Sequence, residues 1–93
     1  MKYRLDESQF DRVQTVYEFA QDYVECHNIE EPIASVKVEA NDAGYREVVI
    51  RLKNAAPRRL GLDEVCEFMD VNYVLLGTYA DNRTWVICGV GIN

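Results

Sequence analysis

The chain has 93 residues, of which 48% are hydrophobic and 28% are charged, and its net charge is −6. This length limits it to one domain, residues 1–93, with the composition of a globular protein. The negative net charge repels phosphate backbones and argues against general nucleic-acid binding. No apolar run approaches the roughly 20 residues of a membrane span, and residues 1–8 contain no apolar signal region. We therefore expect a cytoplasmic protein without membrane contact.

The first expected element is an amphipathic helix over residues 10–27. Apolar side chains recur there at steps of three and four, which is the helical period. Asp6 or Ser8 can cap its start, and Asn28 suits a left-handed stop before Pro32. On the opposite side of this helix we expect an acidic stripe without an intervening Lys or Arg. The stripe consists of Asp11, Glu18, Asp22 and Glu25.

Two strands joined by a turn follow this helix. Residues 33–40 and 45–53 alternate apolar and polar side chains, and the sequence Asn-Asp-Ala-Gly between them is a turn signal. Matching the apolar faces leaves two registers open. We favour Lys37 opposite Glu47, because the alternative places Glu39 opposite Glu47 and facing like charges are unfavourable.

A second helix and a hairpin complete the expected fold. Residues 62–70 predict a short helix with Asp63 and Glu64 in its first turn, where the helix dipole favours acids. A tight turn at Asp81–Asn82 then joins two strands between Tyr73 and Gly91. The prediction is a two-layer α+β fold of order α-β-β-α-β-β, in which two helices pack on one four-stranded antiparallel sheet.

The C-terminal hairpin is apolar on both of its expected faces. A two-residue turn places Tyr79 opposite Thr84 and Leu75 opposite Cys88. Three arrangements cover such a hairpin: helices split between its faces, a curled sheet, or a second chain, since large exposed apolar patches mark interfaces. We favour a homodimer, with contacts from Tyr73, Leu75, Tyr79 and Val86.

The sequence predicts no cofactor and no metal site. Asp63, Glu67 and Asp70 have a spacing suited to a hard cation, but no Gly-containing ligand loop accompanies them, so a solvated helix face is favoured. Cys26 and His27 are adjacent and lack the second spaced ligand pair of a zinc site. The three cysteines are widely spaced and odd in number, which favours reduced thiols over a disulfide framework.

The basic segment of residues 46–59 has a net charge of +4 in an otherwise acidic chain. Arg51, Arg58 and Arg59 therefore form a candidate local anion site. Its alternative is an exposed loop, because charged side chains generally stay solvated.

The acidic stripe is the least ordinary feature of the sequence. A solvated polar face is one interpretation. The other is a contact surface for a basic protein partner, since the row is not neutralised by its own helix. The size, the charge and the absence of a catalytic set resemble those of small stoichiometric effectors, including phage-encoded viral inhibitors.

These features predict a non-enzymatic protein-binding module that acts stoichiometrically on a protein with a basic surface. The alternative is a small-molecule-binding dimer or minor enzyme. Its pocket would lie between the sheet and the first helix and be lined by Tyr23, His27 and Cys66.

Overall fold

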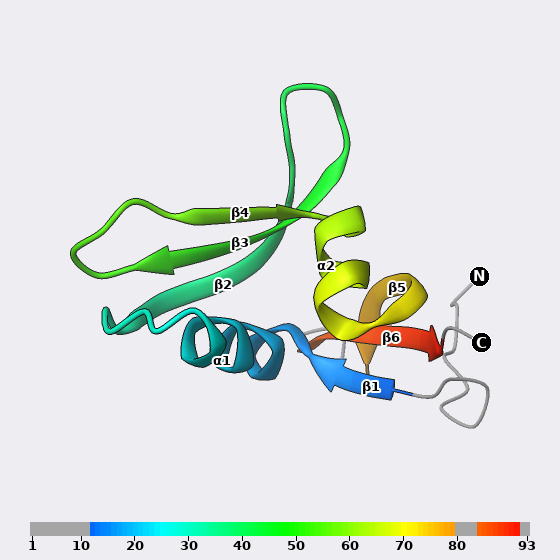
Figure 1. Ribbon diagram of the computed structural model, residues 1–93. Coiled ribbons are helices and arrows are strands. Elements are labelled where there is room, and N and C mark those ends of the chain that lie inside the picture. Colours follow the sequence, from blue (N-terminus) through cyan, green and yellow to red (C-terminus); the bar gives the residue numbers. More distant parts are fainter. Residues whose placement is uncertain (1–11, 80–83, 92–93) are drawn as a thin grey trace.

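The computed structural model describes residues 12–79 and 84–91, which form an α+β fold (Figure 1). The elements are, in chain order, β1 (Arg12–Thr15), α1 (Val16–Cys26), β2 (Ile33–Ala40), β3 (Arg46–Leu52), β4 (Arg58–Gly61), α2 (Leu62–Met69), β5 (Val71–Tyr79) and β6 (Thr84–Gly91).

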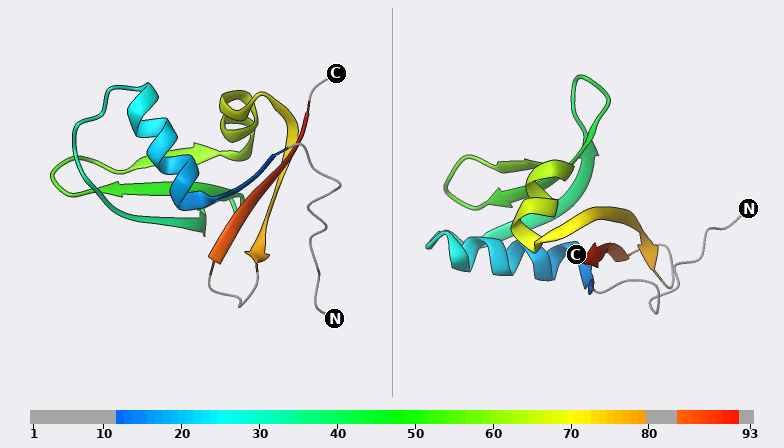
Figure 2. Two further views of the ribbon diagram at one scale, coloured as in Figure 1. Left: turned by 90° about the horizontal axis from the view of Figure 1, so that it is seen from below. Right: turned by 45° about the vertical axis from the view of Figure 1, so that its right-hand side comes forward.

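The strands form two antiparallel sheets. The first has the strand order β1-β6-β5 and the second the order β2-β3-β4. The prediction of one four-stranded sheet and of the order α-β-β-α-β-β is therefore wrong, because the described residues add the strands β1 and β4. Figure 2 shows the two sheets on different sides of the molecule, with α1 running alongside the β2-β3-β4 sheet.

The first helix begins later than predicted, because residues 12–15 form β1 and pair with β6. Thr15 caps the helix: its hydroxyl accepts a hydrogen bond from the Glu18 N–H at 3.1 Å, and the Glu18 carboxylate accepts one from the Thr15 N–H at 3.1 Å. This reciprocal capping box fixes the start of α1 at Val16. The expected caps Asp6 and Ser8 lie outside the described residues, whereas Asn28 has the predicted left-handed conformation, with φ of 54°.

The β2–β3 hairpin adopts the register that we did not favour. Glu39 lies opposite Glu47. The like charges are compensated by two arginines, because Arg51 forms an ion pair with Glu39 and Arg59 forms one with Glu47. The second arginine comes from β4, a strand that the sequence analysis placed in a loop.

The turn of this hairpin also sets the register. The Asn41 side chain accepts hydrogen bonds from the N–H groups of Ala43 and Tyr45, both at 3.0 Å. The Asn41 N–H donates to the Tyr45 carbonyl at 2.8 Å and closes a three-residue loop. Gly44 lies in that loop with φ of 87°, the left-handed conformation that such loops require.

The C-terminal hairpin has the predicted backbone register. Tyr79 pairs with Thr84 and Leu75 with Cys88, and the pairing extends to Tyr73. The predicted turn at Asp81–Asn82 lies outside the described residues.

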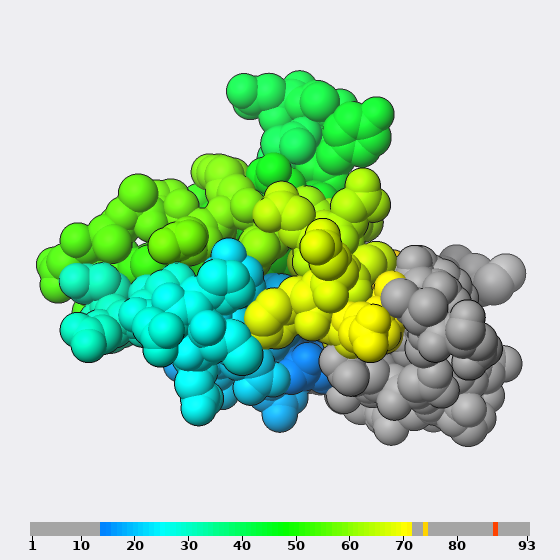
Figure 3. All heavy atoms as spheres, in the orientation of Figure 1, coloured from blue at the N-terminus to red at the C-terminus, as the bar shows by residue number. Residues whose placement is uncertain are grey.

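The two helices lie side by side on one face of the molecule, where Figure 3 shows α1 in blue to cyan and α2 in yellow. Neither of these helices is long and apolar enough to cross a membrane. In Figure 3 the β2–β3 turn projects beyond them.

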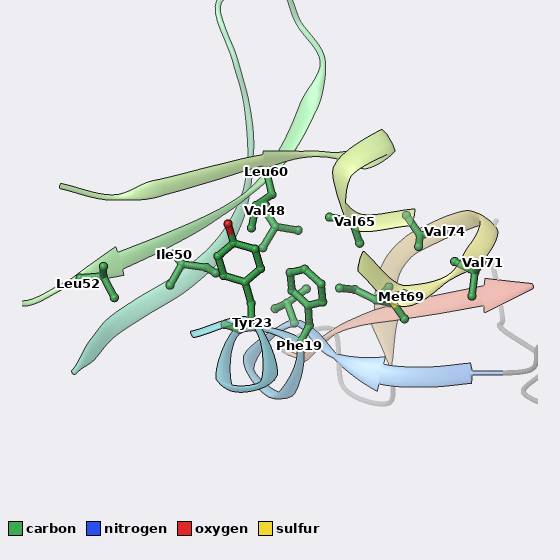
Figure 4. Packing of buried hydrophobic residues seen from close by; sticks show 13 residues of the cluster. Phe19, Tyr23, Val48, Ile50, Leu52, Leu60, Val65, Met69, Val71 and Val74 are labelled. Carbon is green, nitrogen blue, oxygen red and sulfur yellow. The ribbon is translucent and has the colours of Figure 1, made fainter. Parts of the chain in front are cut away.

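One hydrophobic core joins both helices to both sheets (Figure 4). Phe19 of α1, Ile50 of β3 and Ile87 of β6 are fully buried, and Met69 of α2 is 1% exposed. Because the helices turn their apolar sides to this core, their polar sides form an outer surface of the molecule.

Candidate functional site

The helices carry negative charge only. Neither helix contains Lys or Arg, and all of their acidic side chains are exposed. These side chains, which we call the acidic helix face, belong to Glu18, Asp22, Glu25, Asp63, Glu64 and Glu67. The β2-β3-β4 sheet, by contrast, has five basic and two acidic residues. The two helices are thus acidic, whereas this sheet has a net positive charge.

Three of the four predicted stripe residues lie exposed on α1, and Asp11 lies outside the described residues. The Thr15 backbone N–H, and then its hydroxyl, donate hydrogen bonds that lower the pKa of the Glu18 carboxyl. Asp22 accepts a hydrogen bond from Gln14 Nε2 at 2.9 Å. The Glu25 carboxylate makes no hydrogen bond or ion pair with another described residue, so it is the stripe carboxylate most available to a partner.

A hollow of about 220 Å³ opens between α1 and α2. We call it the interhelix hollow. Its lining residues come from the end of α1, from β4 and from α2, and they are Tyr23, His27, Leu60, Glu64, Glu67 and Phe68.

Aromatic rings form one wall of the interhelix hollow. The His27 ring stacks on Tyr23 with centroids 4.0 Å apart, and Phe68 lies 5.5 Å from Tyr23 and 6.1 Å from His27. His27 Nδ1 lies 2.9 Å from the Tyr23 carbonyl oxygen. Because a carbonyl only accepts hydrogen bonds, Nδ1 is the donor in this contact.

Two carboxylates of the acidic helix face also line the interhelix hollow. Glu64 is held by one long hydrogen bond, from the Gly61 N–H at 3.4 Å. The Glu67 carboxylate forms no hydrogen bond or ion pair within the described part of the chain. No Lys or Arg is among the lining residues, so their charge favours a cation.

The pocket predicted for the alternative function lies between the sheet and the first helix, whereas the interhelix hollow lies between the two helices. Tyr23 and His27 line the interhelix hollow together, but Cys66 packs against the core and is not among its lining residues. The sequence analysis missed Glu64, Glu67 and Phe68 as neighbours of His27. All three residues lie on α2, and no local pattern in the sequence indicates that α2 lies beside the end of α1.

A larger, open groove of about 650 Å³ lies between the β2–β3 turn and the start of α2. Its walls include the exposed ring of Tyr45 and the charged side chains of Arg46, Glu47 and Asp63. Glu64 lines it as well, so the groove has three carboxylates and one arginine, and its net charge favours a cation over an anion.

The structure does not bring the three arginines of the candidate anion site together. Arg51 and Arg59 lie on the outer face of the β2-β3-β4 sheet, where each pairs with a glutamate. Arg58 lies opposite Ile50 in the β3–β4 pairing and therefore belongs to the other face.

The predicted dimer contacts lie in the C-terminal hairpin, and their side chains lie outside the described part of the structure. The described side chains of that hairpin include Val74 and Ile87, which are 9% and 0% exposed in the core. The candidate contacts Tyr73, Leu75, Tyr79 and Val86 occupy positions that alternate with these two along β5 and β6.

Cysteines and metal ligands show no clustering in the described residues. Cys26 is exposed, Cys66 is half-buried, and both are free thiols. No group of three or more His, Cys, Asp or Glu side chains within residues 12–79 and 84–91 is arranged to hold a metal ion.

In comparisons with known proteins, the chain matches no protein family model, no curated protein and no solved structure.

Proposed function

We propose that this protein is a non-enzymatic binding module that occupies the basic surface of a protein partner with its acidic helix face. One observation carries the proposal: six exposed carboxylates lie on two adjacent helices that contain no Lys or Arg. Their mutual repulsion is unfavourable in the free protein and would be relieved by a cationic surface. The protein would act stoichiometrically, in the manner of a small phage-type inhibitor.

Charge alone does not supply high affinity. An exposed ion pair contributes only about 0–1 kcal/mol, because both charges are already well solvated. Complementary charge instead raises the association rate and selects among partners. The proposal therefore requires apolar or stacking contacts beside the carboxylates, and the interhelix hollow lies among them.

The experiment compares two single charge reversals. Glu25→Lys changes the acidic helix face, whereas Asp42→Lys makes the same charge change in the exposed β2–β3 turn. Partners are captured from the native host with the wild-type chain, purified, and measured against both variants. We expect Glu25→Lys to weaken binding and Asp42→Lys to leave it nearly unchanged. Equal effects, or a captured partner without a basic surface, would refute the proposal.

We further propose that the chain is a homodimer that uses the outer face of the C-terminal hairpin. The support is the apolar sequence of both hairpin faces, together with the burial of Val74 and Ile87 in the core of the same chain. In this proposal the second copy covers the alternate face of the hairpin.

The alternative function is a small-molecule binder or minor enzyme, and the interhelix hollow is the observation that favours it. Its volume of about 220 Å³ is, however, smaller than the roughly 300–1,000 Å³ of pockets that enclose drug-sized ligands. The protein-binding role is therefore the better supported of the two.

A further inference from the structure

The size of the interhelix hollow selects a small group rather than a whole metabolite. At about 220 Å³ it is larger than the roughly 150 Å³ cavity that holds one benzene molecule. A planar group of four heavy atoms and the methylene next to it fit this volume. The end of an arginine side chain has this size and shape.

The walls of the interhelix hollow also suit a planar cation. Tyr23 is 9% exposed and Phe68 is half-buried, so the surroundings are partly shielded from water. The faces of aromatic rings attract cations, and the flat guanidinium group of arginine stacks on them better than the compact ammonium of lysine. In Figure 4 the Tyr23 hydroxyl points toward Leu60 and β4, which leaves the rest of its ring for packing.

The polar groups of the interhelix hollow complement donors that carry positive charge. The carboxylates of Glu64 and Glu67 accept hydrogen bonds through four oxygen atoms in all. A guanidinium group has five N–H donors in a fixed plane, so it can satisfy several of these acceptors at once. An anion would meet two carboxylates and is disfavoured.

We propose that the interhelix hollow binds the side chain of one arginine from the protein partner. This inference rests on the proposed function, because a basic surface laid against the acidic helix face presents such side chains. The guanidinium group stacks against Phe68 and donates hydrogen bonds to Glu64 and Glu67. Arginine is among the residues that most often dominate the energy of a protein interface. An arginine bound in the interhelix hollow therefore supplies the specific contact that exposed ion pairs lack. We call the interhelix hollow in this role the slot.

The test uses N-acetyl-arginine amide as the probe and the isotopically labelled full chain in an NMR titration. We expect saturable shifts confined to the backbone amides of residues 23–27 and 64–68. N-acetyl-citrulline amide has nearly the same shape without the charge, and we expect it to produce no saturable shifts. Equal responses to both probes would overturn the proposal, as would arginine shifts spread over the whole acidic helix face.

Three variants separate the slot from general attraction by negative charge. Phe68→Leu removes the ring and should weaken arginine amide binding about two- to fivefold, the expected contribution of an exposed cation–π contact. Glu67→Gln should also weaken it, whereas Glu25→Gln removes the same charge from the outside of α1 and should not. If Phe68→Leu perturbs the fold, the comparison of Glu67→Gln with Glu25→Gln still tests the proposal. Equal weakening of arginine amide binding by these two variants would refute the slot.

The slot and the proposed function fail in different experiments. If arginine amide does not bind but Glu25→Lys selectively impairs partner binding, the slot is refuted and the protein-binding role stands. If arginine amide binds with the stated requirements but the partner does not distinguish Glu25→Lys from Asp42→Lys, the slot stands and the wider acidic contact is refuted.

Discussion

Arg51 of β3 reaches across the sheet to Glu39 of β2 and holds its carboxylate through two hydrogen bonds, one of them 3.1 Å long from Nη2 to Oε1. Val49 lies between these residues on the same outer face and is fully buried. On its other side, Arg59 Nη1 lies 3.5 Å from Glu47 Oε1. That oxygen is buried and has no hydrogen bond in the described residues, so the contact is an ion pair only. These charged side chains flank the valine on the face of the sheet opposite Val48 and Ile50 of the core.

The first prediction concerns the Glu39–Arg51 ion pair. The hydrogen bonds from Arg51 lower the pKa of Glu39 below its ordinary value of 4.5. A carboxyl whose pKa is lower in the folded chain stabilises the fold above its unfolded pKa, and this contribution is lost as the pH falls through the folded pKa. We therefore expect Glu39→Gln to destabilise the protein at pH 7 and to approach the wild type at acid pH.

Urea unfolding at a series of pH values checks this expectation. The difference in the free energy of unfolding between wild type and Glu39→Gln should stay constant down to about pH 5 and shrink below pH 4.5. Glu25→Gln is the control, because it removes a carboxylate that has no ion pair among the described residues. A difference that does not change with pH would show that the pair acts by packing over Val49 and not by charge.

The second prediction concerns Gly44 in the β2–β3 turn. Its φ of 87° is unfavourable for residues with a Cβ, although a Cβ built there meets no atom within 4 Å. The cost of Gly44→Ala is therefore a backbone cost, about 1–2 kcal/mol. Gly44→Asn should cost less, because Asn tolerates the left-handed region. Urea unfolding measures both variants, and equal stabilities for Ala and Asn would contradict this account of the turn.

The two hairpins show how far register can be predicted from sequence. In the C-terminal hairpin the prediction assumed a two-residue turn, and the pairing that it gave from Tyr79 to Tyr73 was confirmed. In the β2–β3 hairpin, facing like charges argued against the true register. Arg59, which compensates Glu47, lies on β4, and β4 has no signal of its own in the segment after Pro57. The error arose because the facing pair Glu39–Glu47 was judged without β4, the third strand of the sheet.

The missed strand β1 has a similar cause. Val13 and Val16 continue the helical period of the following residues, so the local pattern predicts helix. The pairing of β1 with β6 joins the two ends of the chain and overrides that pattern. The same limit applies to the interhelix hollow: periodicity placed Tyr23 and His27 on the apolar side of the first helix, but only the fold shows that Phe68 lies beside them.

The third prediction concerns the cap of α1. Thr15→Ala removes the hydroxyl that accepts from the Glu18 N–H, and we expect a loss of about 0.5–2 kcal/mol in the free energy of unfolding. Thr15→Ser keeps the hydroxyl and should lose less. The hydroxyl also contributes to the lowered pKa of Glu18, so that pKa should rise in Thr15→Ala and remain low in Thr15→Ser. An NMR titration of the Glu18 carboxyl measures it, and an unchanged pKa in Thr15→Ala would contradict the hydrogen bond from the Thr15 hydroxyl to the Glu18 carboxylate.

The fourth prediction concerns assembly. If a second copy covers the outer face of the C-terminal hairpin, the wild-type chain should sediment at twice its mass of 10.7 kDa. Leu75→Arg places a charge at a proposed contact position and should produce monomers. A wild-type chain that sediments only as a monomer at high micromolar concentration would refute the dimer, and the hairpin would then be covered by its own chain.

The fifth prediction concerns association through the acidic helix face. Glu18→Lys is a poor test, because Glu18 belongs to the helix cap. Asp22→Lys combined with Glu25→Lys reverses two exposed charges and disturbs only the hydrogen bond from Gln14. Because such charges steer the encounter, this double variant should bind the captured partner with a severalfold lower association rate at low salt.

This difference in association rate should shrink toward 1 M salt, where the screening length falls to about 3 Å. Stopped-flow or surface-binding kinetics measure both rates, with Asp42→Lys as the control. An unchanged rate and salt dependence in the double variant would show that the acidic helix face is only solvated surface.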